Sequence, residues 1–234
     1  MIIALSSTKG GPGKTTATAC LADFFALEGR KVAVLDTDPN QNMTNWYGKS
    51  QDGAFEGIVL RSQDDEDKII DDTEALSAEA EIVLIDVAGV ASRSLLYAAG
   101  IADFVVIPCG TSEDDIIETA KTRDFVVNAA KLSRRGDIPH VALLSRVDPQ
   151  TMVYIHTKVQ LHQHGLRTLR RSLTQRTVYQ KARFYGTTPL RFEPKGQAAD
   201  DIRAVGREIL AMIEHGAPSI EEVEVPEVVG AVTK

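Results

Sequence analysis

The sequence predicts a single-domain α/β fold, with a mostly parallel sheet and helices on both of its faces. Short β-branched apolar segments alternate with longer amphipathic segments, which is the pattern of strands joined by helical crossovers. Several apolar segments are continuous, as expected of strands buried on both faces. The length of 234 residues is enough for one well-buried domain and short for two. We therefore assign residues 1–215 to one domain and residues 216–234 to an acidic tail that we expect to be mobile.

The expected strands are the apolar, β-branched segments, which in order are Ile2–Ser6, Lys31–Asp36, Ala54–Leu60, Glu81–Val87, Phe104–Cys109 and Val141–Val147. The first expected helix, Lys14–Leu27, ends before Gly29, which is a helix stop signal. Further amphipathic segments predict helices at about Asp64–Ala78, Ser92–Ala99, Ser112–Leu132 and about Gln150–His164. Ser112 and Asp115 predict a capping box. The last helix, roughly Gly196–Glu214, is predicted from a single apolar stripe of Ala199, Ile202, Val205, Ile209 and Met212.

Composition excludes several classes of protein. The chain is 43% hydrophobic and 25% charged, which excludes collagen-like and disordered chains. Its two cysteines, Cys20 and Cys109, lie far apart in apolar segments, which is typical of a reducing compartment and excludes a disulfide framework. No apolar segment approaches the ~20 residues that a membrane span needs, and Met1 is not followed by a basic leader. We expect a cytoplasmic protein.

Charge is unevenly distributed along the chain. The net charge is −7, yet residues 158–207 contain eleven Lys or Arg and three Asp or Glu. An acidic protein with one basic region is a candidate for binding a polyanion through that region. The alternative is a solvated face whose cations pair with acidic neighbours, and the charge count does not separate the two.

The strongest motif lies between the first expected strand and the first expected helix. It reads Thr8-Lys9-Gly10-Gly11-Pro12-Gly13-Lys14-Thr15-Thr16. Glycines let the backbone wrap phosphate oxygens with its N–H groups, and the helix N-terminus favours an anion. In such a loop Lys14 reaches the β- and γ-phosphates, and the Thr15 hydroxyl is a ligand for Mg²⁺. The sequence therefore predicts a phosphate-binding loop for a nucleotide.

The loop departs from the general pattern in an informative way. The usual first glycine is replaced by Thr8, and a second lysine, Lys9, precedes the glycines. This arrangement resembles the deviant Walker A motif of the ParA/MinD family of dimeric ATPases, which are P-loop NTPases. The resemblance implies that Lys9 crosses to the phosphates of a partner subunit in an ATP-bound homodimer. A cation that arrives only on dimerisation would stabilise transition-state charge, as an arginine finger does.

Two later segments extend the resemblance. Asp36-Thr37-Asp38-Pro39-Asn40-Gln41-Asn42 resembles the family's switch I segment, which implies that Asp38 orients the attacking water, Asp36 lies near the Mg²⁺ shell and Asn42 belongs to the switch. The segment 81–89 resembles the Walker B strand and switch II, with Asp86 holding Mg²⁺ and Gly89 sensing the γ-phosphate. By the same resemblance, the expected catalytic residues are Lys9, Lys14 and Asp38.

The nucleotide is expected to be ATP with Mg²⁺. Ser145-Arg146-Val147-Asp148 loosely matches the guanine-reading motif of GTPases, so Asp148 is a candidate contact to the base. The match lacks both the Asn or Thr and the Lys of that motif, which favours ATP over GTP.

The resemblance also implies a biological role. Small ParA-type proteins bind non-specific DNA in the ATP state, are associated with the nucleoid in that state, and segregate plasmid or chromosomal DNA with a centromere-binding or adaptor protein. The candidate DNA contacts come from the basic region and are Arg167, Arg170, Arg171, Arg176, Lys181, Arg183, Arg191 and Arg203.

Other functions remain open on the sequence. Residues 42–46 also resemble VirC-type proteins of DNA transfer, although Trp46 is better interpreted as a core residue. A biosynthetic enzyme that shares the loop, of the dethiobiotin-synthetase or cobyrinate-amidase kind, is the main alternative. A MinD-like membrane partner is disfavoured by the acidic tail, and an iron–sulfur reductase by the positions of the cysteines.

Overall fold

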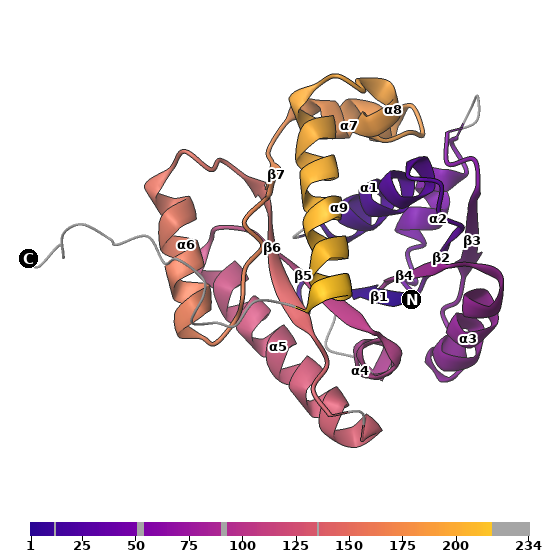
Figure 1. The fold of residues 1–234 in the computed structure, drawn as a ribbon, viewed down its shortest axis with the longest axis horizontal. Helices are drawn as coiled ribbons and strands as arrows, with labels where there is room; N and C mark the ends of the chain where they lie inside the picture. Colours follow the sequence, from indigo (N-terminus) through magenta and orange to yellow (C-terminus); the bar gives the residue numbers. More distant parts are fainter. Residues whose placement is uncertain (12, 51–53, 90–92, 135, 217–234) are drawn as a thin grey trace, which may run out of the picture.

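Parallel strands form the centre of the molecule, as seen in a computed structural model that describes residues 1–11, 13–50, 54–89, 93–134 and 136–216. Over these residues the strands are β1 (Ile2–Leu5), β2 (Val32–Asp36), β3 (Ile58–Ser62), β4 (Ile82–Asp86), β5 (Phe104–Cys109), β6 (His140–Val147) and β7 (Leu173–Thr174). They form one sheet in the order β3-β2-β4-β1-β5-β6-β7 (Figure 1). Every pairing between neighbouring strands is parallel. The predicted fold class is confirmed.

Helices cover both faces of this sheet. They are α1 (Lys14–Leu27), α2 (Asn42–Tyr47), α3 (Ile69–Glu79), α4 (Arg93–Ile101), α5 (Glu113–Ser133), α6 (Met152–Gln163), α7 (Thr177–Phe184), α8 (Pro189–Phe192) and α9 (Gln197–His215), with a short 3₁₀ turn, η1 (Glu66–Lys68), before α3. One buried cluster joins the sheet to α1, α2, α8 and α9. The other joins it to α3, α4, α5 and α6. Two separate cores therefore lie on the two faces, as continuous apolar strands require.

The alternation of side chains along each strand explains these two cores. In β1, Ile3 and Leu5 belong to the cluster with α1, whereas Ala4 belongs to the opposite cluster. Helix α9 packs closely on α1, because Gly206 lies against the ring of Phe24 with no room for a Cβ. This contact holds α9 beside α1, the helix that follows the loop after β1 (Figure 1).

The strand order places the candidate site. From β1 the sheet extends on one side to β4, β2 and β3, and on the other side to β5, β6 and β7. In parallel α/β sheets, ligands bind at the carboxyl ends of the strands where the order reverses in this way. The loops after β1, β2 and β4 meet at this edge, and they carry the three motifs of the sequence.

Some element boundaries differ from those predicted. The expected strand Ala54–Leu60 begins only at Ile58, because Phe55 (φ 63°) and Gly57 (φ 82°) turn the chain before it. The first turn of the expected helix near Asp64 is instead η1, where the Asp65 side chain accepts from the N–H of Asp67. Ser92, the expected start of a helix, lies outside the described residues, as do residues 217–234 of the expected tail.

Candidate functional site

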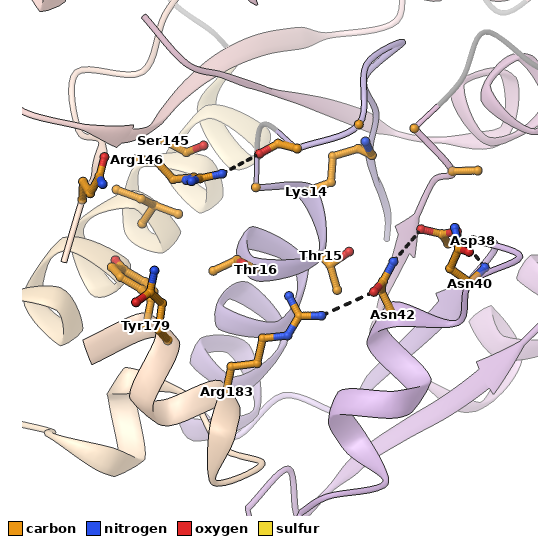
Figure 2. Close-up of a pocket in the computed structure, with 18 of the residues that line it drawn as sticks. Lys14, Thr15, Thr16, Asp38, Asn40, Asn42, Ser145, Arg146, Tyr179 and Arg183 are labelled. Carbon is orange, nitrogen blue, oxygen red and sulfur yellow. Dashed lines mark hydrogen bonds between the residues drawn. The ribbon is translucent and has the colours of Figure 1, made fainter. Parts of the chain in front are cut away.

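The loop between β1 and α1 has the backbone geometry of an anion-binding loop. Gly11 (φ 101°) and Gly13 (φ 95°) occupy the left-handed region, which disfavours any residue with a side chain. A Cβ at Gly13 would also lie 3.0 Å from Oγ of Ser145 in β6. The loop and the start of α1 line a cavity of about 670 Å³, shown in Figure 2. The positive end of the α1 dipole therefore faces this cavity. Pro12 lies outside the described residues.

Lys14 is buried under the loop, with 8% of its surface exposed. Its Nζ donates a hydrogen bond of 2.9 Å to the backbone carbonyl of Lys9. A Cβ at Gly89 would lie 2.8 Å from this Nζ, so the segment after β4 closes over the lysine only because residue 89 is glycine. Burial lowers the pKa of Lys14, and the charges of Asp86 and Asp38 oppose this effect. A partly desolvated cation of this kind is stabilised by an anionic ligand.

Asp86 and Thr15 form an oxygen-rich position beside the loop. Asp86 ends β4, and its Oδ1 accepts a hydrogen bond of 3.1 Å from Oγ1 of Thr18. Burial raises the pKa of Asp86 to about 7, although a hydrogen bond from Thr15 and the charge of Lys14 act in the other direction. Oδ2 of Asp86 is buried and has no hydrogen-bond partner among the residues that the structure describes. A carboxylate oxygen without a partner, next to a threonine hydroxyl, fits a hard cation such as Mg²⁺, which prefers oxygen ligands.

Asp36 lies beside Asp86, because β2 and β4 pair these two residues in register. Its carboxylate accepts hydrogen bonds of 2.9 Å from both the N–H and the hydroxyl of Thr44, and one of 3.2 Å from the N–H of Asp38. Asp36 therefore anchors the loop 38–44 and the start of α2. Its predicted place near the Mg²⁺ shell stays a prediction.

Asp38 lies at the edge of the cavity and is oriented by two asparagines. Its Oδ1 accepts hydrogen bonds from the backbone N–H (2.9 Å) and side-chain amide (3.0 Å) of Asn40, and its Oδ2 accepts one of 3.1 Å from the amide of Asn42. Burial raises the pKa of Asp38, but these bonds and the charge of Lys14 outweigh it, so the pKa lies below its usual value. An ionised, oriented carboxylate can hold a water molecule by its proton.

The far side of the cavity is lined by residues that the sequence analysis did not assign to a nucleotide. Arg146 has an unusual left-handed backbone (φ 59°), and its Nη1 donates a hydrogen bond of 3.0 Å to the carbonyl of Gly11. Tyr179 of α7 lines the same side, with a buried hydroxyl that has no hydrogen-bond partner in the described part of the chain. The remaining residues on this side are Ser145, Leu173, Thr174, Gln175, Arg176, Gln180 and Arg183. The general rule that ligands bind at strand carboxyl ends could have indicated Arg146.

Lys9 and Asp148 do not line the cavity. The Nζ of Lys9 instead forms an ion pair of 2.9 Å with Asp115, the residue that also completes the predicted capping box of α5 with Ser112. This hydrogen bond raises the pKa of Lys9. Oδ1 of Asp148 accepts a hydrogen bond from the N–H of Gln150 and so stabilises the turn before α6. The structure therefore gives no support to Asp148 as a contact to the base.

The predicted DNA contacts fall into two groups. Arg191 pairs with the buried Asp23 (2.7 Å), Arg176 with Asp201 (3.5 Å) and Arg203 with Asp200 (3.2 Å), while Arg183 donates to Asn42. The others are Arg167, which is half-buried, and three exposed residues that form no ion pair within the described part of the chain, namely Arg170, Arg171 and Lys181. Part of the basic region is therefore a face whose cations pair with acidic neighbours, which was the alternative to a polyanion-binding surface.

Two features are absent from the described residues. Among them, no helix is both long enough and apolar enough to span a bilayer. Nor do the described residues bring three or more His, Cys, Asp or Glu side chains together as a metal-binding group.

Comparison with known proteins identifies the family. The chain matches the CobQ/CobB/MinD/ParA nucleotide binding domain over residues 3–223 and belongs to that family. It is similar to Protein ParA of Rhizobium radiobacter, with 28% identity over 180 residues that cover 76% of this chain and 80% of the relative. Protein virC1 of Rhizobium rhizogenes is 28% identical over 152 residues, which cover 62% of this chain and 64% of the relative.

A solved structure shows the same fold. The apo structure of McdA from Cyanothece superposes with a TM-score of 0.75 at 17% identity, over 89% of this chain and 98% of the other. This match confirms the P-loop NTPase fold that the loop motif predicted, and the family match confirms membership of the nucleotide-binding family that includes ParA and MinD.

Proposed function

We propose that the protein is a Mg²⁺-dependent ATPase that dimerises on binding ATP, binds non-specific DNA in that state, and segregates or positions plasmid or chromosomal DNA. The observation that carries this proposal is that Lys14 and Asp38 line one cavity, while the buried Asp86 is close enough to Lys14 for its charge to act on the lysine and Lys9 lies on the adjacent surface. A family member that only binds nucleotide would not need the oriented carboxylate of Asp38.

The chemistry follows from these side chains. Lys14 and the loop N–H groups bind the phosphates, and Thr15 and Asp86 would hold Mg²⁺, which supplies positive charge to the phosphate oxygens when bound. Asp38 orients the attacking water through a carboxylate that Asn40 and Asn42 hold in place. The family relationship favours ATP, and Asp148 does not line the cavity, as a contact to guanine would require.

The dimer and the DNA surface rest on the resemblance together with exposure. Lys9 has 38% of its side chain exposed and pairs with Asp115, whose side chain is 19% exposed, so a partner's phosphates could take the place of Asp115. Arg170, Arg171 and Lys181 are exposed cations that could contact DNA phosphates. A centromere-binding or adaptor protein would couple the DNA-bound dimer to its cargo. The similarity to Protein virC1 leaves DNA transfer, in place of DNA segregation, as an alternative role for the same ATPase.

The experiment measures binding of random-sequence duplex DNA with ATP, ADP or no nucleotide, using Asp38→Ala to slow hydrolysis. We expect tight, salt-sensitive binding with ATP alone. Replacing Arg170 and Arg171 by Ala should weaken it and reduce the log–log salt slope by about 2. The matched control replaces Arg30 and Lys31, two exposed cations immediately before β2 at the opposite end of the strands.

Two outcomes would contradict the proposal. Equal binding or no binding in all three nucleotide states would remove the DNA role and favour a biosynthetic enzyme of the same family, whose turnover ignores DNA. Lys9→Ala should retain ATP binding but stay monomeric in sedimentation experiments with ATP. Dimers of unchanged affinity would exclude the role of Lys9 across the interface.

A further inference from the structure

Arg183 occupies a place that its assignment to DNA does not explain. It lies near the end of α7, yet it lines the nucleotide cavity. Its Nη2 donates a hydrogen bond of 3.4 Å to Oδ1 of Asn42, and its guanidinium lies 5.2 Å from the centre of the Trp46 ring. Figure 2 shows the side chain pointing from α7 toward Asn42. This cation is thus directed into the site and toward α2.

The contact with Arg183 determines which way the amide of Asn42 faces. An asparagine amide has one oxygen that accepts and one NH₂ group that donates. With its oxygen on Arg183, the NH₂ group of Asn42 donates to Oδ2 of Asp38 at 3.1 Å. A flipped amide would place its oxygen against the carboxylate of Asp38 and its NH₂ group against a cation, and both contacts would be repulsive. Arg183 therefore selects the orientation in which Asn42 holds Asp38.

Arg183 is in turn held by the surface between α2 and α7. Trp46 of α2 is buried, with 1% of its surface exposed, and its Nε1 donates a hydrogen bond of 3.1 Å to the carbonyl of Thr187, three residues after α7. A cation over a tryptophan ring is attracted by the ring electrons. The indole thus fixes both the guanidinium and the segment that follows α7.

We propose that Arg183 is a positioning residue for ATP hydrolysis, which acts through Asn42 on the water-orienting carboxylate of Asp38. The proposal rests on the ATPase function proposed above. It assigns Arg183 to the nucleotide site and removes it from the DNA surface. A purely structural arginine, or one that contacts DNA, would behave differently in the experiment below.

The experiment is a double-mutant cycle on DNA-free ATP hydrolysis. Arg183→Ala should lower kcat roughly tenfold through loss of orientation, with KM and nucleotide affinity changed less than about threefold. Asn42→Ala should lower kcat by a similar factor, and the Arg183→Ala/Asn42→Ala double variant should be no slower than Asn42→Ala alone, because both changes remove one connection. Arg183→Lys should recover part of kcat, since an ammonium group can donate to the same amide oxygen. Arg207→Ala, which removes an exposed arginine of α9 outside the cavity, is the matched control and should keep wild-type kcat.

A spectroscopic measurement tests the geometry without turnover. The chain contains one tryptophan, so its emission reports on Trp46 alone. Arg183→Ala should change that emission, and Arg207→Ala should leave it unchanged.

The outcomes are distinguishable from failure of the proposed function. If the wild-type protein does not hydrolyse ATP, the proposed function and this inference fall together. If it does, unchanged kcat in Arg183→Ala, or losses that multiply in the double variant, would overturn the role of Arg183 alone. An unchanged Trp46 emission would overturn the contact itself.

Discussion

The buried ion pair between Asp23 and Arg191 yields the sharpest prediction about stability. Asp23 is on α1 and has no exposed surface, whereas Arg191 of α8 is 27% exposed, and the two groups are 2.7 Å apart. The hydroxyl of Thr188 also donates to Asp23. Arg191→Ala would leave the Asp23 carboxylate buried without its cation, which typically costs ~3–5 kcal/mol. Partial exposure of Arg191 admits water, so we expect a loss of about 3 kcal/mol, or roughly 6–12 °C in Tm for a chain of this size.

Urea unfolding and thermal melting followed by circular dichroism measure this loss. The matched control is Arg203→Ala, which also removes one arginine from an ion pair. Its partner Asp200 lies at the surface, with 69% of its side chain exposed. That change should cost less than about 0.5 kcal/mol. The double replacement Asp23→Leu/Arg191→Met should recover much of the loss, since it removes both charges. Equal stability of Arg191→Ala and Arg203→Ala, together with weakened DNA binding by Arg191→Ala, would refute this reasoning and restore Arg191 to the DNA surface.

Three further predictions concern single residues. Lys14→Ala should weaken ATP binding by about 10- to 100-fold, because it removes a charge-assisted contact to the phosphates. Calorimetric titration measures the affinity for ATP. An affinity equal to that of the wild-type protein would contradict the assignment of Lys14 to the nucleotide site. Gly206→Ala should destabilise the chain by about 1–3 kcal/mol, because its Cβ would overlap the Phe24 ring. Gly100→Ala is the control, since its Cβ would lie 3.9 Å from its nearest neighbour, and it should be neutral or stabilising; equal effects would contradict the packing argument. Burial raises the pKa of Cys109 to about 12, so this thiol should react with a disulfide reagent at pH 8 only after unfolding. Prompt labelling of Cys109 in the native chain would contradict this prediction, because it would show that the thiol is accessible.

The phosphate loop could be predicted because its signal is local. Its nine consecutive residues contain the lysine, the threonine hydroxyls and the glycines, of which Gly11 and Gly13 have positive φ in the structure. The same holds for Asp36 and Asp86, which end apolar strands and are brought together by the parallel register of β2 and β4. Local patterns and general rules of parallel sheets were therefore enough for the phosphate side of the site.

Apart from Arg146, the opposite side of the cavity could not be predicted because its signal is not local. Strand β7 has two residues and α2 has six, which are too short for a period to be recognised. Arg183 meets Asn42 across 141 residues, and Arg191 meets Asp23 across 168. A charge count treats such arginines as equal to the exposed ones, because it contains no information about which acid or amide the fold brings near each cation.

Helix α7 connects these two kinds of residue. Lys181 and Arg183 are two positions apart, which is roughly 200° around a helix, so their side chains leave α7 in different directions. Both side chains are exposed, but Arg183 also lines the cavity. Under the proposed function, a DNA phosphate on Lys181 and a nucleotide beside Arg183 act on one helix of eight residues. If α7 couples the two ligands, the factor by which nucleotide changes the affinity for DNA equals the factor by which DNA changes the affinity for nucleotide, because linkage between two binding sites is reciprocal. A DNA surface and a hydrolytic site on the same short helix can be coupled through that helix alone. This is the physical basis on which ATP binding could control DNA binding in this chain.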